Sequence, residues 1–134
     1  MRSRLGRDIL LAAACLLASG LPAVAQSPSA PPVRQCFIAG EFGNWRAADA
    51  RTVYIRVRMN KIFRLDMANE CSLLLSPDAR LITVFRGSDL ICSPLDWDLK
   101  VNAGIGGNAV PCRVKAMTLL TLAEASALPK NIRP

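Results

Sequence analysis

Cysteine is the residue type with the most definite chemistry in this sequence. Beyond Cys15 near the start, the chain has four cysteines separated by 34, 20 and 19 residues: Cys36, Cys71, Cys92 and Cys112. None belongs to a C-x-x-C pair, the spacing with which one turn presents two ligands to a structural zinc ion. We therefore expect no metal site and two disulfides, for which three pairings are open. We favour Cys36 with Cys112 and Cys71 with Cys92, because Cys36 opens the first predicted strand and Cys112 opens the last.

Any catalysis by this chain must work without histidine, which is absent from the sequence. The absence removes the commonest general base near neutral pH and the most frequent metal ligand. A carboxylate pair is the chemistry that remains, and the candidates are Asp96, Asp98 and Glu70. Asp96 and Asp98 flank Trp97 on one face of a predicted strand, which favours a solvated edge with the indole in the core. An EF-hand calcium loop is excluded because its sixth-position glycine is missing, and we expect no cofactor.

Basic side chains gather between residues 56 and 64 and form a candidate anion-binding surface: Arg56, Arg58, Lys61 and Arg64. The whole chain has a formal net charge of +7, which favours anionic partners. Apolar residues alternate with the first two arginines, so we expect both arginines to point outward beside Tyr54. Such a surface would bind an anionic envelope component or an acidic partner protein. The alternative is a solvated face that protects a strand edge from aggregation.

A glycine-rich run at residues 104–109 matches the dinucleotide-binding pattern G-x-G-x-x-[GA]. Pro111 and a predicted strand follow directly, so no helix N-terminus is available to hold a phosphate. We expect a hairpin loop at this position.

Short strands are the elements that must position these residues. Alternation of apolar and polar residues predicts a half-buried strand over 52–58, and a turn leads to a second strand over 62–67. The apolar run over 80–86 predicts a strand buried on much of both faces. Further short strands are expected over 90–92, 97–101 and 112–117.

The end of the chain carries a helix signal instead. Thr121 followed by Glu124 forms a capping box, which predicts a helix over 122–128 whose apolar residues cover an open end of the sheet. The predicted fold is therefore all-β and mainly antiparallel. It is a small disulfide-stapled barrel or sandwich with a short C-terminal helix.

The beginning of the chain has the pattern of a secretory signal peptide. Three arginines precede an apolar run, and Ala23-Val24-Ala25 supplies a small-residue cleavage site. Cys15 offers a lipoprotein alternative, although few apolar residues precede it. We divide the chain into a signal peptide (1–25), a flexible Pro/Ser-rich tether (26–35), a single β-rich domain (36–128) and a tail (129–134). We expect a periplasmic or secreted protein, which would not meet nucleic acid because it lies outside the cytoplasm. We also expect that it is not transmembrane, because no apolar run is long enough to span a bilayer.

The order of these features resembles a known family, the small exported bacterial proteins grouped as domain of unknown function 6491. The similarity lies in the succession Cys36, Trp45, an alternating strand over 53–58, Cys71, Leu90-Ile91-Cys92, Asp98-Leu99-Lys100-Val101 and Cys112-Arg113-Val114. It covers roughly residues 36–122. The resemblance implies a secreted or periplasmic β-rich domain with paired cysteines, and it carries no catalytic residue onto this chain.

Two functions from different classes follow from these features. We expect a non-enzymatic exported domain that binds a partner or an envelope component through its sheet face or its basic hairpin. The alternative is a histidine-free hydrolase or lyase of the cell envelope that uses the carboxylates named above. A deep pocket joining two carboxylates about 5 to 10 Å apart would favour the enzyme, and a filled core with shallow clefts would favour the binding domain.

Overall fold

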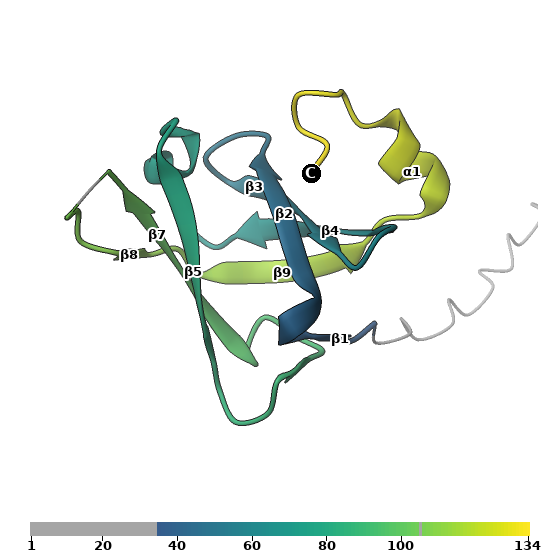
Figure 1. The fold of residues 1–134 in the computed structure, drawn as a ribbon, viewed down its shortest axis with the longest axis horizontal. Helices are drawn as coiled ribbons and strands as arrows, with labels where there is room; N and C mark the ends of the chain where they lie inside the picture. The colour runs from purple at the N-terminus through teal and green to yellow at the C-terminus, as the bar shows by residue number, and fades with distance from the viewer. Residues whose placement is uncertain (1–34, 105) are drawn as a thin grey trace, which may run out of the picture. The chain divides into compact units, whose positions relative to one another are not determined.

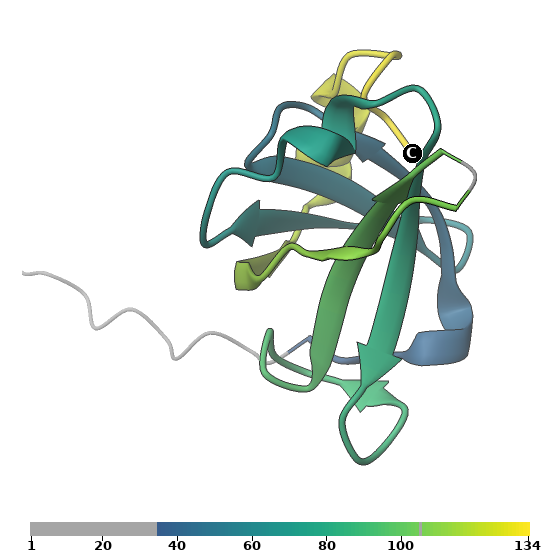
Figure 2. The same ribbon diagram turned by 90° about the vertical axis from the view of Figure 1, so that its left-hand side faces the viewer.

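Antiparallel strands in three hydrogen-bonded sheets form most of the fold in the part of the chain that the computed structural model describes, residues 35–104 and 106–134 (Figure 1). The predicted signal peptide, Cys15 and residues 26–34 of the predicted tether lie outside the described residues. The three sheets do not join into a closed barrel, and their arrangement is sandwich-like (Figure 2). The predicted all-β class is confirmed.

The largest sheet is built on the predicted hairpin. Its order is β2 (Phe42–Ala47), β3 (Thr52–Val57), β4 (Lys61–Met67) and β9 (Val114–Leu119). Val53, Ile55 and Val57 of β3 are completely buried, and the register sets the first two opposite Leu65 and Phe63 of β4. The alternation over residues 52–58 therefore identified the inner face correctly, because successive side chains of a strand point to opposite faces.

A second sheet faces the first across the core. Its order is β5 (Ala79–Phe85), β7 (Trp97–Ala103) and β8 (Val110–Pro111), and a small ladder joins β1 (Phe37–Ile38) to β6 (Leu90–Ile91). Short 3-10 helices, η1 (Ala39–Glu41) and η2 (Ser72–Leu75), lie between strands. The core side chains of this half include Phe37, Ile91, Trp97, Leu99 and Val101, all buried. Trp97 thus occupies the core as predicted, and the glycine-rich run lies between two paired strands, β7 and β8.

The four cysteines form two disulfides, as predicted, but with a different pairing. Cys36 is bonded to Cys92, and Cys71 is bonded to Cys112, with Cα atoms 4.1 Å and 5.8 Å apart. The favoured pairs, Cys36 with Cys112 and Cys71 with Cys92, were wrong. The first strand pairs with β6 and not with the last strand, and its register places Cys36 opposite Cys92. Because β4 pairs with β9, the segment after β4 meets the segment before β9 and brings the other two cysteines together.

Strand β5 is more exposed than its apolar run predicts. Ile82, Val84 and Phe85 are 39%, 44% and 39% exposed, so the expectation of burial on both faces was wrong. Leu81 and Thr83 face the core opposite Val101 and Leu99 of β7. The strand lies at the edge of its sheet, and a strand with one covered face buries only alternate residues.

The predicted helix forms as α1 (Leu122–Ala127) and begins with the predicted capping box. The Glu124 carboxylate accepts the backbone N–H of Thr121, and the Thr121 hydroxyl accepts the backbone N–H of Glu124. No residue of α1 is buried and Leu122 is 77% exposed, so its apolar residues do not cover the sheet. The residues after α1, predicted as a tail, turn back toward β2 and β3, and Pro134 is buried (Figure 1).

Candidate binding surfaces

The hairpin end of the predicted basic surface contains an ion pair within the chain. Arg58 lies in the turn after β3 with a positive φ of 56°, and its guanidinium forms an ion pair with Glu41 of η1. The hydrogen bond from Arg58 is the largest cause that holds the pKa of Glu41 below its ordinary value, and the charge of Lys61 acts in the same direction. Two of the predicted anion-binding cations therefore share an anion of this chain.

The other two predicted cations lie on the outer face of the large sheet. Arg56 is half-buried opposite Ile62, and Arg64 is exposed opposite Tyr54. The Arg64 Nε lies 2.8 Å from a carboxylate oxygen of Asp66. Among the described residues, Arg56 is the member of the predicted surface that has neither an ion pair nor a nearby acid assigned to it. Two of the four predicted cations, Arg58 and Arg64, thus have acidic partners within the chain.

The three candidate catalytic carboxylates have partners within the fold. The Asp96 carboxylate accepts the backbone N–H groups of Cys92 and Ser93 at 2.8 and 2.7 Å and so closes the loop before β7. Two nitrogens of the Arg86 guanidinium bind both oxygens of Asp98 at 2.7 to 3.0 Å.

The third carboxylate, Glu70, lies 3.9 Å from Arg51, and both side chains are mostly exposed. Three surface cavities lie in the described part of the chain, and none is lined by two of the three candidates: one contains Asp98 and another contains Glu70. Across residues 35–104 and 106–134, no group of three or more potential metal-ligating side chains comes together.

The outer edge of β5 carries backbone groups without partners. The N–H of Arg86 donates to the carbonyl of Asp96 at 2.9 Å and continues the β5–β7 ladder. Backbone groups of successive residues point to opposite edges of a strand. The backbone N–H and C=O groups of Leu81, Thr83 and Phe85 therefore point away from β7. Since β5 is the last strand of its sheet, no other strand in the described part of the chain pairs with this edge.

Exposed apolar and basic side chains accompany this open edge. Ile82 and Val84 project from the outer face of β5, between Arg80 and Arg86. Lys100 of β7 lies directly opposite Ile82. Within the described ranges, neither Arg80 nor Lys100 has an acid within ion-pair distance, whereas Arg86 is bound to Asp98. The face next to the open edge is thus apolar at its centre and positively charged around it.

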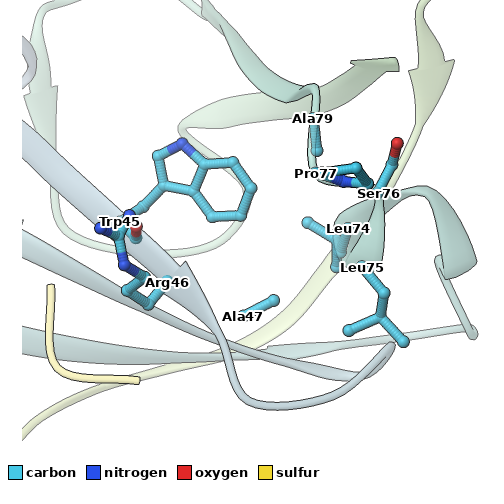
Figure 3. Close-up of a pocket in the computed structure, with 8 residues that line it drawn as sticks. All are labelled: Trp45, Arg46, Ala47, Leu74, Leu75, Ser76, Pro77 and Ala79. Carbon is cyan, nitrogen blue, oxygen red and sulfur yellow. Dashed lines mark hydrogen bonds between the residues drawn. The ribbon is translucent and has the colours of Figure 1, made fainter. Parts of the chain in front are cut away.

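A cavity of about 320 Å³ lies between β2 and the start of β5 (Figure 3). The indole of Trp45 points from β2 toward the side formed by Leu74, Pro77 and Ala79. The edge of β2 is closed at this point by local hydrogen bonds. The N–H of Trp45 donates to the Asn44 side chain at 2.9 Å, and its carbonyl accepts the Arg46 guanidinium at 3.1 Å. The edge of β5, by contrast, has no such local partners at Leu81, Thr83 and Phe85 among the described residues.

A second cavity, of about 300 Å³, lies between β7 and the start of β9. We call it the β7–β9 cleft, and it is lined by Arg86, Pro94, Leu95, Trp97, Asp98, Leu99, Arg113 and Val114. Its walls combine the buried inner residues of two strands with two arginines. The sequence signals for this cleft and for the open edge were weak, because both depend on which strands lack a neighbour.

Comparisons of the chain with protein-family models, curated proteins and solved structures find no match. Among the described residues there is no helix with the length and apolar character needed to cross a bilayer.

Proposed function

We propose that this chain is an exported, non-enzymatic binding domain and that β5 pairs with an extended acidic segment of a partner protein. Export to the periplasm or medium is part of the proposal. It is supported by the signal-peptide pattern and by two disulfides, which persist in oxidising compartments. The family resemblance of the sequence belongs to the same proposal.

The open edge of β5 is the observation that carries the binding proposal. An extended peptide can add to such an edge as a further strand, with backbone hydrogen bonds for affinity and alternate side chains for specificity. The free N–H and C=O groups of Leu81, Thr83 and Phe85 are the groups that such a strand would use. Each net hydrogen bond contributes about 0.5 to 1.5 kcal/mol, so we expect a weak, reversible complex.

Charge complementarity selects an acidic segment as the occupant. Arg80 and Lys100 have no acidic partner among the described residues, and they flank the exposed Ile82 and Val84. Side chains directly opposite each other on paired strands interact, and opposite charges are favourable there. A bound strand should therefore place apolar side chains beside Ile82 and Val84 and an acidic one beside Arg80.

Replacement of Thr83 by proline tests the edge directly. Thr83→Pro removes an N–H that points away from β7, and proline is tolerated at such edge positions. The variant should fold and lose binding of a labelled peptide that alternates acidic and apolar residues, measured by fluorescence anisotropy. Ile82→Pro is the matched control for geometry, because its N–H points into the β5–β7 ladder and its loss should destabilise the fold.

Two further measurements separate the proposal from other anionic partners. Arg80→Gln should weaken peptide binding, and a peptide of the same composition in scrambled order should bind less well. Thr83→Ala keeps the N–H and should bind like the unmodified chain. Equal binding by a folded Thr83→Pro variant would contradict strand addition, and binding to anionic vesicles but not to the peptide would identify a lipid surface as the partner instead.

A further inference from the structure

We propose that the acidic segment bound at the edge of β5 also places an aromatic side chain, tyrosine or phenylalanine, in the cavity beside Trp45. The inference rests on the proposed function, because it takes strand addition at β5 as given and names the partner residue that selects this site. The cavity of about 320 Å³ separates Trp45 of β2 from a wall that includes Leu74, Pro77 and Ala79, and we call it the Trp45 cavity (Figure 3).

The Trp45 cavity is continuous with the open edge of β5. Ala79 lines the cavity and is also the first residue of β5. Its side chain is on the inner face of the strand, two residues before Leu81, and both pack against the core. Trp45 also faces inward, since it lies opposite the buried Ile55 in the register of β2 with β3. A strand added to β5 would therefore direct its inner-face side chains to the side on which the cavity lies.

Inward-facing side chains of both edge strands are incompletely covered. Phe85 lies opposite the buried Trp97 and so faces inward, yet it is 39% exposed. Trp45 and Ala79 are half-buried, although both pack against the core. Burial of apolar surface that is still accessible to water is favourable. The inner side of the β5 edge can therefore gain further apolar contacts from a bound strand.

The lining of the Trp45 cavity combines apolar and polar groups, and this combination selects an aromatic side chain. The indole of Trp45 offers a ring that a second ring can meet in an offset or edge-on arrangement, and Pro77 lies on the opposite side (Figure 3). Ser76 and Arg46 also line the cavity and supply a hydroxyl and a guanidinium. Tyrosine matches both kinds of group, because its ring is apolar and its hydroxyl both donates and accepts hydrogen bonds.

The register of β5 determines which partner residue would reach the cavity. Backbone pairing with an antiparallel strand uses the three free positions of the edge and ends at Ala79, because the N–H of Ala79 already donates to the Ser76 carbonyl at 3.0 Å. Residues directly opposite each other on paired strands share a face. The partner residue beside Arg80 is therefore on the outer face, and the next residue toward the partner's C-terminus is on the inner face beside Ala79. The expected motif is an acidic residue followed directly by an aromatic one.

Peptides that differ at one position test this motif. Each ends in the order valine, threonine, valine, threonine, glutamate and then tyrosine or alanine, which sets the valines beside Val84 and Ile82 and the glutamate beside Arg80. In fluorescence anisotropy, the tyrosine peptide should bind the oxidised chain about tenfold more tightly than the alanine peptide, as expected for one aromatic contact. A peptide with glutamate and tyrosine exchanged directs the ring to the outer face and should bind no better than the alanine peptide.

Substitution of Trp45 completes a double-mutant cycle with these peptides. Trp45→Ala should weaken binding of the tyrosine peptide about tenfold and leave binding of the alanine peptide unchanged. Met59→Ala, at a position 92% exposed on the β3–β4 turn, is the control and should change neither. An NMR measurement on the unmodified chain keeps the test valid if Trp45→Ala does not fold. The chain has two tryptophans, Trp45→Phe assigns their indole signals, and the tyrosine peptide should shift the Trp45 signal more than the alanine peptide does.

Thr83→Pro separates this inference from the proposed function, and we expect a folded variant to lose both peptides. Equal binding of the tyrosine and alanine peptides by the unmodified chain, with loss of both in Thr83→Pro, would overturn the inference and leave the proposed function intact. An advantage of the tyrosine peptide that persists in Trp45→Ala would place the ring elsewhere and would also overturn the inference. Undiminished binding of the tyrosine peptide by Thr83→Pro would contradict strand addition itself.

Discussion

Removal of either disulfide should cost this chain a large part of its stability. The bridges join residues 56 and 41 positions apart in sequence. Closing loops of these lengths in the unfolded chain corresponds to about 4 kcal/mol of stabilisation each. The two loops overlap between Cys71 and Cys92, so the second bridge restricts a chain that the first has already restricted. We therefore expect about 3 to 4 kcal/mol for each bridge when it is removed alone.

The structure predicts different local consequences for the two bridges. Cys36–Cys92 holds the two-residue strands β1 and β6 together, and these strands place Phe37 and Ile91 in the core. Cys71–Cys112 joins the segment after β4 to the segment before β9, and both of its cysteines are buried. Its removal should therefore add a loss of packing to the entropic effect.

Paired cysteine-to-alanine variants measure these effects without leaving a free thiol. Urea unfolding of the Cys36→Ala/Cys92→Ala and Cys71→Ala/Cys112→Ala variants gives the change in the free energy of unfolding. Peptide mapping of the unreduced chain verifies the pairing. A loss below about 1 kcal/mol for both variants would refute the loop-entropy estimate. A map that joins Cys36 to Cys112 would refute the observed β1–β6 register.

Three further sets of substitutions test separate parts of the fold. Ile55→Ala removes a completely buried side chain and should cost about 2 to 5 kcal/mol in urea unfolding, whereas Met59→Ala, at a position 92% exposed, should cost little. Thr121→Ala removes the α1 cap and should lower stability by about 0.5 to 2 kcal/mol; an unchanged amide exchange rate in α1 would contradict this. The pKa of Glu41 and the pKa of Glu124 are both lowered from 4.5, chiefly by hydrogen bonds from Arg58 and from the Thr121 backbone, respectively. The ionised carboxylates therefore stabilise the folded chain above the unfolded pKa, and this contribution is lost as pH falls below about 4.5. Glu41→Gln and Glu124→Gln should each reduce the decrease in the free energy of unfolding that is measured as the solution is acidified.

Local patterns in the sequence determined several parts of this protein. The alternation of Val53, Ile55 and Val57 identified the inner face of the central hairpin, because the side-chain period of a strand is fixed by backbone geometry. Thr121 and Glu124 identified the start of α1 for a similar reason, since both hydrogen bonds of a capping box join residues within one turn. The even number of widely spaced cysteines indicated two disulfides, which depends on composition and not on topology.

Tertiary structure alone decided the pairing of those cysteines, because it depends on which distant strands become neighbours. The same holds for β5. Its apolar run is typical of a strand buried on both faces, but the sheet leaves one of its faces and one of its edges uncovered. The basic residues of the hairpin were correctly placed outside the core. The acidic partners of two of them, Glu41 for Arg58 and Asp66 for Arg64, emerged only when η1 and the β3–β4 register were formed. The local sequence determines which face of a strand a side chain occupies, whereas long-range packing determines which residues surround it.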